Sequence, residues 1–472
     1  MSWKAKPDAE YIQKFAQGRR DYWGAQALLD DRFFQLSQKE KVVSAADMGG
    51  RDAEKPPLKA LRMGYAGVVI DRDSAVISVP PFLRVNAVGM TVEKERHASS
   101  KLEPWLQGAW RQSVVEPVWD RQVRDLRLFG RGWSNVLLLP RLWSSEDEEY
   151  GRLVGEWVGA VEKGEEREVA ELREEIEEFK LENFPIRWQY CDARTTWPLL
   201  SKERHLPEVV ELRSMTAAEV AADYGDDALP GGMNLNGSGG NARLDVYVYS
   251  NWEWTATVIG NKTAPGLARI WRHGLGRSPY ALAETNVVPD NERNIRWKSS
   301  LFDYEDAIEA MDEGMTDMRT IHRRYTLSQP HITVDPQARF NSDPAAMAHP
   351  EKHIDYSADK PFVSLKGEEV GLMPTPTLNP SSIPYIQELR RFNETMTLNP
   401  IEQGRVRSGL SGVGFVSALQ AAQTDLGPYK RALDGAANEV GELFFKAVVR
   451  LSKEYPDAPD EIFVVHEKGG RI

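Results

Sequence analysis

The sequence predicts an α+β protein built from more than one folding unit. A chain of 472 residues is too long for one ordinary hydrophobic core, so we expect two or three units. Long stretches with apolar residues at helical spacing occur near both ends and in the middle of the chain, whereas short runs rich in β-branched and aromatic residues gather between positions 133 and 260. Helices and strands therefore both contribute to the fold.

Composition narrows the class of protein. Hydrophobic residues make up 41% of the chain and charged residues 28%, which excludes wholesale disorder. No apolar run approaches the roughly 18 residues needed to span a bilayer, and residues 1–10 are too polar for a signal peptide, so we expect a soluble, cytoplasmically assembled protein without a membrane partner. The single Cys191 fits a reducing compartment, as a small apolar filler.

The net charge of −12 bears on possible partners. It argues against a protein that grips a phosphate backbone over a broad basic face. It is compatible with DNA as cargo, because an acidic surface offers few contacts that would hold DNA in place.

The first third of the chain alternates helical and extended patterns. Residues 8–38 are predicted to be helical, and residues 48–61 to form a loop. Residues 65–88 fit either a strand or a helix that ends before the paired prolines. A helix over residues 114–128 should stop at a glycine turn before a buried strand at residues 133–139.

Residues 145–182 are dominated by acids. An apolar stripe of Val169, Leu172, Ile176 and Phe179 runs through them, so we predict one amphipathic helix with an acidic outer face. A solvated face is favoured over metal binding, because nothing in the pattern fixes an oxygen cage.

Short strands follow, at residues 185–190 and 209–213, with a helix over residues 216–224 capped by Thr216. The strongest hairpin signal in the sequence joins residues 244–250 to residues 253–260. These segments indicate an antiparallel sheet region.

Residues 298–326 predict a helix with a heptad stripe. Two rows repeat every seven residues: Leu301, Ile308, Met315 and His322, and Tyr304, Met311, Met318 and Tyr325. Such a stripe needs a neighbour to cover it. Ser300 is expected to cap this helix, with Asp303 in the reciprocal position.

Residues 413–455 predict a second long helix, with a kink at Gly427 and Pro428. Its apolar stripe consists of Leu426, Tyr429, Leu433, Ala436, Val440, Leu443, Ala447 and Leu451. A last short strand is expected at residues 461–465.

Searches for chemistry find no catalytic residues, no cofactor and no metal site. A phosphate-binding P-loop motif is absent, and the glycine-rich segment at residues 409–414 does not follow a strand. His349 and His353 are separated by a proline and lack a third ligand at a recognised spacing. Cys191 has no nearby histidine to activate it. We therefore expect that the protein is not an enzyme.

A resemblance to a known family rests on the order of several segments. These are LFGRGWSNVLLLP, FPIRWQYCDARTTW, DVYVYSNWEWTATVIG and GLGRSPYAL, followed by a helix, a Pro-rich insert, a second helix, a Gly-rich loop and a long helix. Over residues 22–455, this order resembles the portal proteins of tailed double-stranded DNA bacteriophages.

The resemblance implies a portal-like fold with a mixed α/β wing, a two-helix stem, a small α/β clip and a long kinked wing helix, the crown being reduced or absent. The implied parts are the N-terminal wing (1–297), stem helix 1 (298–326), clip (327–381), stem helix 2 (382–397), tunnel loop (398–412), long wing helix (413–455) and C-terminal tail or vestigial crown (456–472). Ser382 is expected to cap the second stem helix, with Pro384 in its first turn.

The same resemblance implies three sets of functional residues. The stem acids expected to line a channel are Asp306, Glu309, Glu313 and Asp317. The tunnel-loop residues expected to face DNA are Asn399, Gln403, Arg405 and Arg407. The clip residues expected to dock a motor are Arg339, Lys352, Lys360, Lys366, Glu368 and Glu369. Arg405 and Arg407 are equally well explained as partners of wing acids.

The function implied is a structural conduit at one capsid vertex of the virion, through which DNA is packaged and ejected. The expected partners are further copies of the chain in a ring of twelve, double-stranded DNA, the terminase large subunit, head-completion or adaptor proteins and the major capsid protein. Two alternatives stay open: another head-to-tail connector component, and an α+β hydrolase with a carboxylate pair hidden among its many acids.

Overall fold

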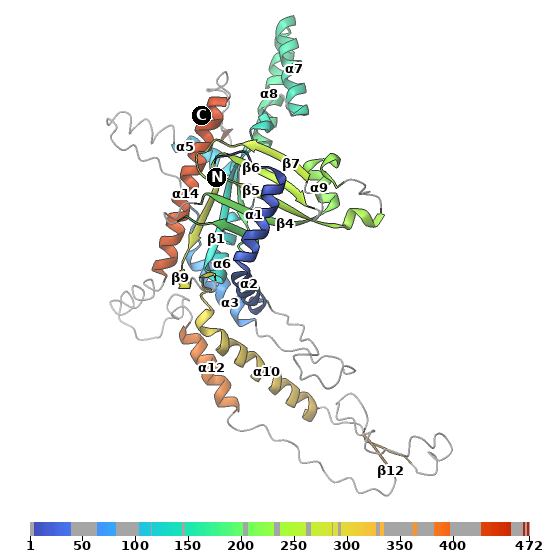
Figure 1. Ribbon diagram of the computed structural model, residues 1–472, viewed down its shortest axis with the longest axis vertical. Helices are drawn as coiled ribbons and strands as arrows, with labels where there is room; N and C mark the ends of the chain where they lie inside the picture. Colours follow the sequence, from blue (N-terminus) through green and yellow to red (C-terminus); the bar gives the residue numbers. More distant parts are fainter. Residues whose placement is uncertain are drawn as a thin grey trace. The chain divides into compact units, whose positions relative to one another are not determined.

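The computed structural model shows a mixed α+β protein whose two larger sheets are antiparallel (Figure 1). It describes residues 4–38, 64–81, 103–114, 116–143, 147–201, 206–230, 237–260, 266–285, 287–290, 294–326, 331–334, 362–365, 382–396, 426–454, 466–467 and 470–471. The chain divides into two compact units. The first comprises Met1–Phe34, Ile70–Ser300 and Gly404–Ile472, and the second comprises Gln35–Val69 and Leu301–Gln403.

The larger sheet of the first unit has five antiparallel strands in the order β3-β4-β5-β6-β7. Their bounds are Thr196–Leu199, Glu208–Thr216, Arg243–Ser250, Trp254–Gly260 and Gly266–Arg272. The predicted hairpin is confirmed as β5–β6. Its turn is closed by Asn251, whose side-chain oxygen accepts hydrogen bonds from the backbone N–H groups of Glu253 and Trp254 at 2.9 and 2.8 Å.

Two helices cover this sheet. Helix α1 (Ala9–Tyr22) begins at Asp8, whose carboxylate accepts from the Tyr11 backbone N–H, and it buries Ile12 against Tyr249 and Val258. Helix α9 (Ala217–Tyr224) packs around Val220 and carries the predicted Thr216 cap as a full capping box with Glu219. Both helix starts follow local side-chain chemistry.

The smaller sheet has three antiparallel strands in the order β2-β1-β8, with bounds Ile186–Cys191, Arg131–Leu138 and Tyr280–Glu284. Helix α6 (Val118–Phe129) leads into β1 through Gly130, whose φ of 73° lies in the left-handed region. A Cβ at Gly130 would lie only 2.3 Å from the Lys298 carbonyl oxygen. Glycine is therefore required at this turn. The predicted order of helix, glycine and strand is confirmed, but the helix begins at Val118 and not at residue 114, and the strand begins at Arg131 and not at residue 133.

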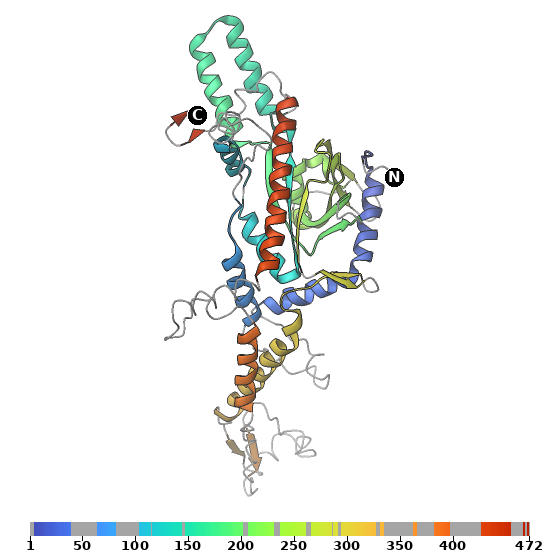
Figure 2. The same ribbon diagram turned by 90° about the vertical axis from the view of Figure 1, so that its left-hand side faces the viewer.

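Helix α14 (Gly427–Glu454) runs along this smaller sheet (Figure 2). All eight predicted stripe residues are buried. Residues 413–425 of the predicted helix lie outside the described residues, so the predicted kink stays a prediction. Gly427 and Pro428 lie in the first turn of α14, and Leu426 before them is in a turn. Proline is tolerated there because the first-turn N–H groups have no partner within the helix. Tryptophans on α5 (Glu103–Ser113) and β2, Trp110 and Trp188, extend the aromatic core beside Phe444 of α14.

The acidic segment is not the single helix that its stripe predicts. It forms α7 (Glu148–Lys163) and α8 (Glu166–Glu182), separated by Gly164 at φ 75°. The two helices pack on each other through Leu153 and Ala160 on one side and Leu172 and Phe179 on the other. A left-handed glycine ends α7, because few other residues adopt that backbone conformation without strain.

The remaining elements are short or link the larger ones. The predicted helix over residues 8–38 is broken at Trp23, so that α2 (Gly24–Ser37) follows α1, and the segment after residue 64 is the helix α3 (Tyr65–Ile77) rather than a strand. The others are η2 (Pro140–Trp143), η3 (Asp226–Ala228), η4 (Gly237–Asn241), β9 (Val287–Asp290), β10 (Ile295–Trp297), β13 (His466–Glu467) and β14 (Gly470–Arg471). In the part of the chain that is described, no helix has the length and hydropathy to cross a membrane.

The second unit contains the pair of helices α10 (Glu305–Thr326) and α12 (Ser382–Met396) and a pair of parallel strands, β11 (His331–Val334) and β12 (Phe362–Leu365). Pro384 lies in the first turn of α12, as predicted. Three other predicted features, the loop over 48–61, the histidines at 349 and 353 and the strand over 461–465, lie outside the described residues.

The predicted start of the first stem helix is wrong. A 3₁₀ turn, η5 (Phe302–Tyr304), precedes α10, and the Ser300 hydroxyl donates to the Arg127 carbonyl oxygen at 2.9 Å instead of capping a helix. The Ser300 backbone N–H donates to the same oxygen at 3.0 Å. Ser300 thus satisfies a carbonyl left open at the C-terminal end of α6, a tertiary role that local sequence does not reveal.

Candidate functional site

The α10–α12 pair is the part of the predicted site that the structure describes best. The two helices approach closely at Gly314, where a Cβ would lie 3.2 Å from both Cγ1 and Cδ1 of Ile386 on α12. Leu301, Ile308 and Met311, all three from the predicted heptad rows, are 2 to 3% exposed. Two further members of these rows, Tyr304 and Met315, are half-buried. The heptad pattern therefore predicted part of the buried face correctly.

The predicted channel acids lie on the face of α10 opposite this buried row. Positions 306, 309, 313 and 317 recur at three or four residues and therefore share one side of the helix. Asp306 and Glu313 are exposed, and Glu309 is half-buried. Asp317 belongs to the same helix, but its side chain lies outside the described part. One helix thus carries an apolar face that is covered and an acidic face at which two carboxylates reach solvent.

The other predicted sites fall outside the described residues. This applies to the tunnel-loop residues Asn399, Gln403, Arg405 and Arg407. It also applies to the clip residues Arg339, Lys352, Lys360, Lys366, Glu368 and Glu369. Within the predicted clip, the described residues are those of the two parallel strands, which pair His331 with Phe362 and Val334 with Leu365.

Helix α14 is held within the first unit by charge as well as by its stripe. The Arg277 guanidinium lies 3.5 Å from a carboxylate oxygen of Glu439 and 3.2 Å from one of Glu442. Burial raises the pKa of Glu439, while hydrogen bonds from Lys446 lower the pKa of Glu442. This cluster ties α14 to the loop before β8 through ion pairs.

A buried carboxyl group is the clearest perturbed acid in the first unit. Burial raises the pKa of Asp125 to about 7, and the nearby charge of Asp192 adds to the shift. Asp125 Oδ2 accepts a hydrogen bond of 2.6 Å from the Tyr190 hydroxyl and one of 3.3 Å from the Ala193 backbone N–H. Asp125 belongs to α6, and these two hydrogen bonds tie α6 to the end of β2. Because Asp125 is buried, it does not face the open cleft that a hydrolase acid requires.

Two further reactive side chains have structural explanations. Cys191 is fully buried, and burial raises the pKa of its thiol, so the reactive thiolate is suppressed. Burial lowers the pKa of His273 to about 4, and the ring of His273 is held by the Asn251 carbonyl oxygen and the Leu275 backbone N–H. Groups of three or more metal-ligating side chains are absent from the described residues.

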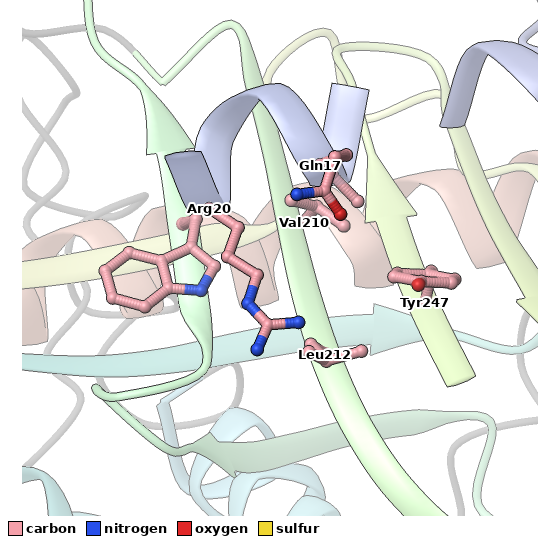
Figure 3. Close-up of a pocket in the computed structure, with 7 residues that line it drawn as sticks. Gln17, Arg20, Val210, Leu212 and Tyr247 are labelled. Atoms are coloured by element: carbon pink, nitrogen blue, oxygen red, sulfur yellow. The ribbon is translucent and has the colours of Figure 1, made fainter. Parts of the chain in front are cut away.

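A shallow depression lies where α1 crosses the five-stranded sheet (Figure 3). It is lined by Ala16, Gln17, Arg20, Trp197, Val210, Leu212 and Tyr247. Arg20 and Gln17 enter from α1, and Leu212 and Tyr247 belong to β4 and β5. The lining contains no carboxylate, thiol or imidazole, so it has no pair of groups for acid–base or nucleophilic chemistry.

Searches against protein-family models and against curated proteins found no match to this chain.

Proposed function

We propose that this chain is the portal protein of a tailed double-stranded DNA bacteriophage, a ring-forming conduit at one capsid vertex. The observation that carries the proposal is the α10–α12 pair, in which an apolar face is covered while an acidic face remains open to solvent at Asp306 and Glu313. The order in the chain supports it further, since α10, an insert with two strands, α12 and then the long α14 follow one another.

Repulsion between the carboxylates of α10 and the phosphates of DNA explains how such a ring would let DNA pass. A ring of such helix pairs presents carboxylates to the axis, and carboxylates do not form the counterion-releasing contacts that hold DNA. DNA then moves past the wall without sticking. The basic residues Arg405 and Arg407 are proposed as phosphate contacts.

The proposal includes the remaining parts of the assembly. Twelve copies form the ring, residues 327–381 dock the terminase large subunit and later a head-completion or adaptor protein, and the wing contacts the major capsid protein. The chain itself is not an enzyme on this view, because the packaging motor belongs to another chain. Its location is the virion.

Mass photometry and negative-stain imaging of the purified chain test the proposal. We expect closed rings with a central channel, in at least one condition of a matrix that varies salt and magnesium. A monomer in every condition would overturn the ring. A connector of another kind would also form rings, so cross-linking of the ring to a terminase large subunit through residues 327–381 distinguishes a portal from such a connector.

A further inference from the structure

The outer face of α7 is an apolar surface that the described residues leave open. The core of the α7–α8 hairpin is formed on the α7 side by Tyr150, Leu153, Trp157 and Ala160. Val154, Val158 and Val161 recur at four and three residues beside that core row and form a valine strip along one side of α7. Val158 is 42% exposed and Val161 48%.

Two glycines widen this open face. Gly155 and Gly159 lie one helical turn apart, and a Cβ built at either would meet nothing within 4 Å. At Gly132 and Gly314, by contrast, a Cβ would press on neighbouring atoms of the chain. Glycine inside a helix lowers stability relative to alanine, so the described intramolecular packing gives no reason for it in α7.

Together the valine strip and the two glycines make a smooth docking face, which we define as Val154, Gly155, Val158, Gly159 and Val161. Glycines without side chains allow another backbone to approach closely, and the valines offer apolar area beside them. This is the surface that a second helix requires.

The charge of the α7–α8 hairpin indicates which kind of helix would bind the docking face. Residues 147–183 contain fourteen Asp and Glu against five Lys and Arg, a net charge of −9 within a chain of −12. Arg152, Arg167 and Arg173 already pair with glutamates four residues later, so the surplus is acidic. A second copy of the hairpin, a nucleic acid or an anionic membrane would be repelled by this field.

We propose that the docking face binds a basic amphipathic helix of a partner protein, whose apolar side lies on the valine strip while its lysines and arginines meet the surrounding glutamates. This surface lies outside the stem, clip and tunnel loop. The inference therefore does not depend on the proposed ring.

The test uses the full chain and a labelled model peptide of about 18 residues, long enough to match the 16 residues of α7. The peptide carries leucine and alanine on one face and lysine elsewhere, and a matched peptide has glutamate for lysine. Fluorescence anisotropy near physiological ionic strength, at which exposed charges are screened beyond about 8 Å, measures both affinities. We expect the basic peptide to bind and the acidic peptide not to bind.

The decisive variant is Gly155→Gln with Gly159→Gln. Glutamine is a better helix former than glycine, so this variant should melt at or above the wild-type temperature while its side chains block close approach. We expect at least about tenfold weaker binding of the basic peptide. Gly18→Gln is the matched control, since Gly18 is a helical glycine of α1 with equally open space, and it should bind as the wild type does.

A second variant removes apolar area instead of adding bulk. Val158→Ser with Val161→Ser keeps every charge of the hairpin and should also weaken binding of the basic peptide. Undiminished binding by both variants, equal binding of the acidic peptide, or no binding of the basic peptide by the wild type would each overturn the proposal.

Discussion

Arg131 and Asp30 form a two-pronged ion pair in the interior of the first unit. Arg131 Nη2 lies 2.6 Å from Asp30 Oδ2 and Nη1 lies 3.2 Å from Oδ1, and the two side chains are 0% and 1% exposed. Arg131 also donates to the Ala193 carbonyl oxygen at 2.7 Å and lies over the Trp297 ring. The pair joins α2 to β1, two elements that lie a hundred residues apart in the chain.

Breaking this pair should destabilise the first unit strongly. Arg131→Met leaves the Asp30 carboxylate buried without its cation, which costs about 3 to 5 kcal/mol in the free energy of unfolding. Urea denaturation measures the change. Lys14→Met, which breaks the exposed pair with Glu10, is the control and should have little effect. Arg131→Met together with Asp30→Leu should recover part of the loss, and a single variant as stable as the wild type would contradict the prediction.

The Asp125–Tyr190 contact predicts a pH dependence of stability. The pKa of Asp125 is about 7 in the folded chain and near 3.9 in an unfolded one. Between these two pH values Asp125 is protonated in the folded chain and ionised in the unfolded chain. Its contribution to the free energy of unfolding is therefore complete below about pH 4 and is lost as the pH rises through about 7. Burial raises the pKa of Tyr190 above its usual range, so its phenol stays protonated and continues to donate across this interval.

The variant Asp125→Asn isolates this effect. We expect its urea midpoint to decline less than that of the wild type between about pH 5 and about pH 8, because the neutral amide has no proton to lose. The exposed Asp226→Asn is the matched control and should follow the wild-type curve. Parallel curves for Asp125→Asn and the wild type would refute the assignment.

The α10–α12 contact should be sensitive to volume at Gly314. Gly314→Leu forces a side chain into the space held by Ile386, and overpacking costs about 1 to 3 kcal/mol, which outweighs the gain in helix propensity. Hydrogen exchange of the α10 and α12 amides should become faster. Gly435→Leu on α14, where a Cβ meets nothing within 4 Å, is the control. Unchanged protection in α10 would show that the helices separate without cost.

The exposed acids of α10 should matter for DNA movement and not for assembly. Asp306→Lys with Glu313→Lys places cations where the proposal has a repelling wall, so DNA packaging in vitro should slow severalfold, most strongly at low salt. Ring formation by negative-stain imaging is the control measurement. Normal packaging rates by the substituted rings would count against a channel-lining role for these acids.

The two arginines of the proposed tunnel loop require a separate test. Replacing Arg405 and Arg407 by alanine should leave ring assembly intact and impair DNA packaging, because phosphate contacts would be lost. Failure of the ring to assemble would instead assign both arginines a structural role, as partners of acids in the wing.

Local sequence patterns predicted an element correctly wherever residues close together in the sequence determine it. The stripe of α14 predicted eight buried residues because a 3.6-residue period leaves one apolar face, and Thr216 and Asn251 fixed a helix start and a turn through hydrogen bonds to neighbours in sequence. The split between α7 and α8 was also signalled, by Gly164, but the apolar stripe through the segment obscured it.

Polar contacts between residues far apart in the sequence could not be predicted from local patterns. No sequence pattern near Asp30 indicates Arg131 as its partner. The sequence predicts Ser300 as a helix cap, but in the structure its hydroxyl donates a hydrogen bond to the carbonyl oxygen of Arg127. The raised pKa of Asp125 likewise depends on burial beneath groups distant in sequence. The two alternatives for residues 65–88 were separated only by the structure, which has the helix α3 there.

The sequence by itself determined the α+β class, the buried face of α14, part of the buried face of α10 and the strands β1, β2, β4, β5 and β6, because hydrophobic periodicity and capping are properties of neighbouring residues. The tertiary structure decided which of the many charged residues are buried, which helical glycines face open space, and which apolar strip on α7 remains uncovered. These three properties depend on which residues lie opposite in space. Such neighbours are brought together only by the folded chain, so the spacing of residues in the sequence does not reveal them.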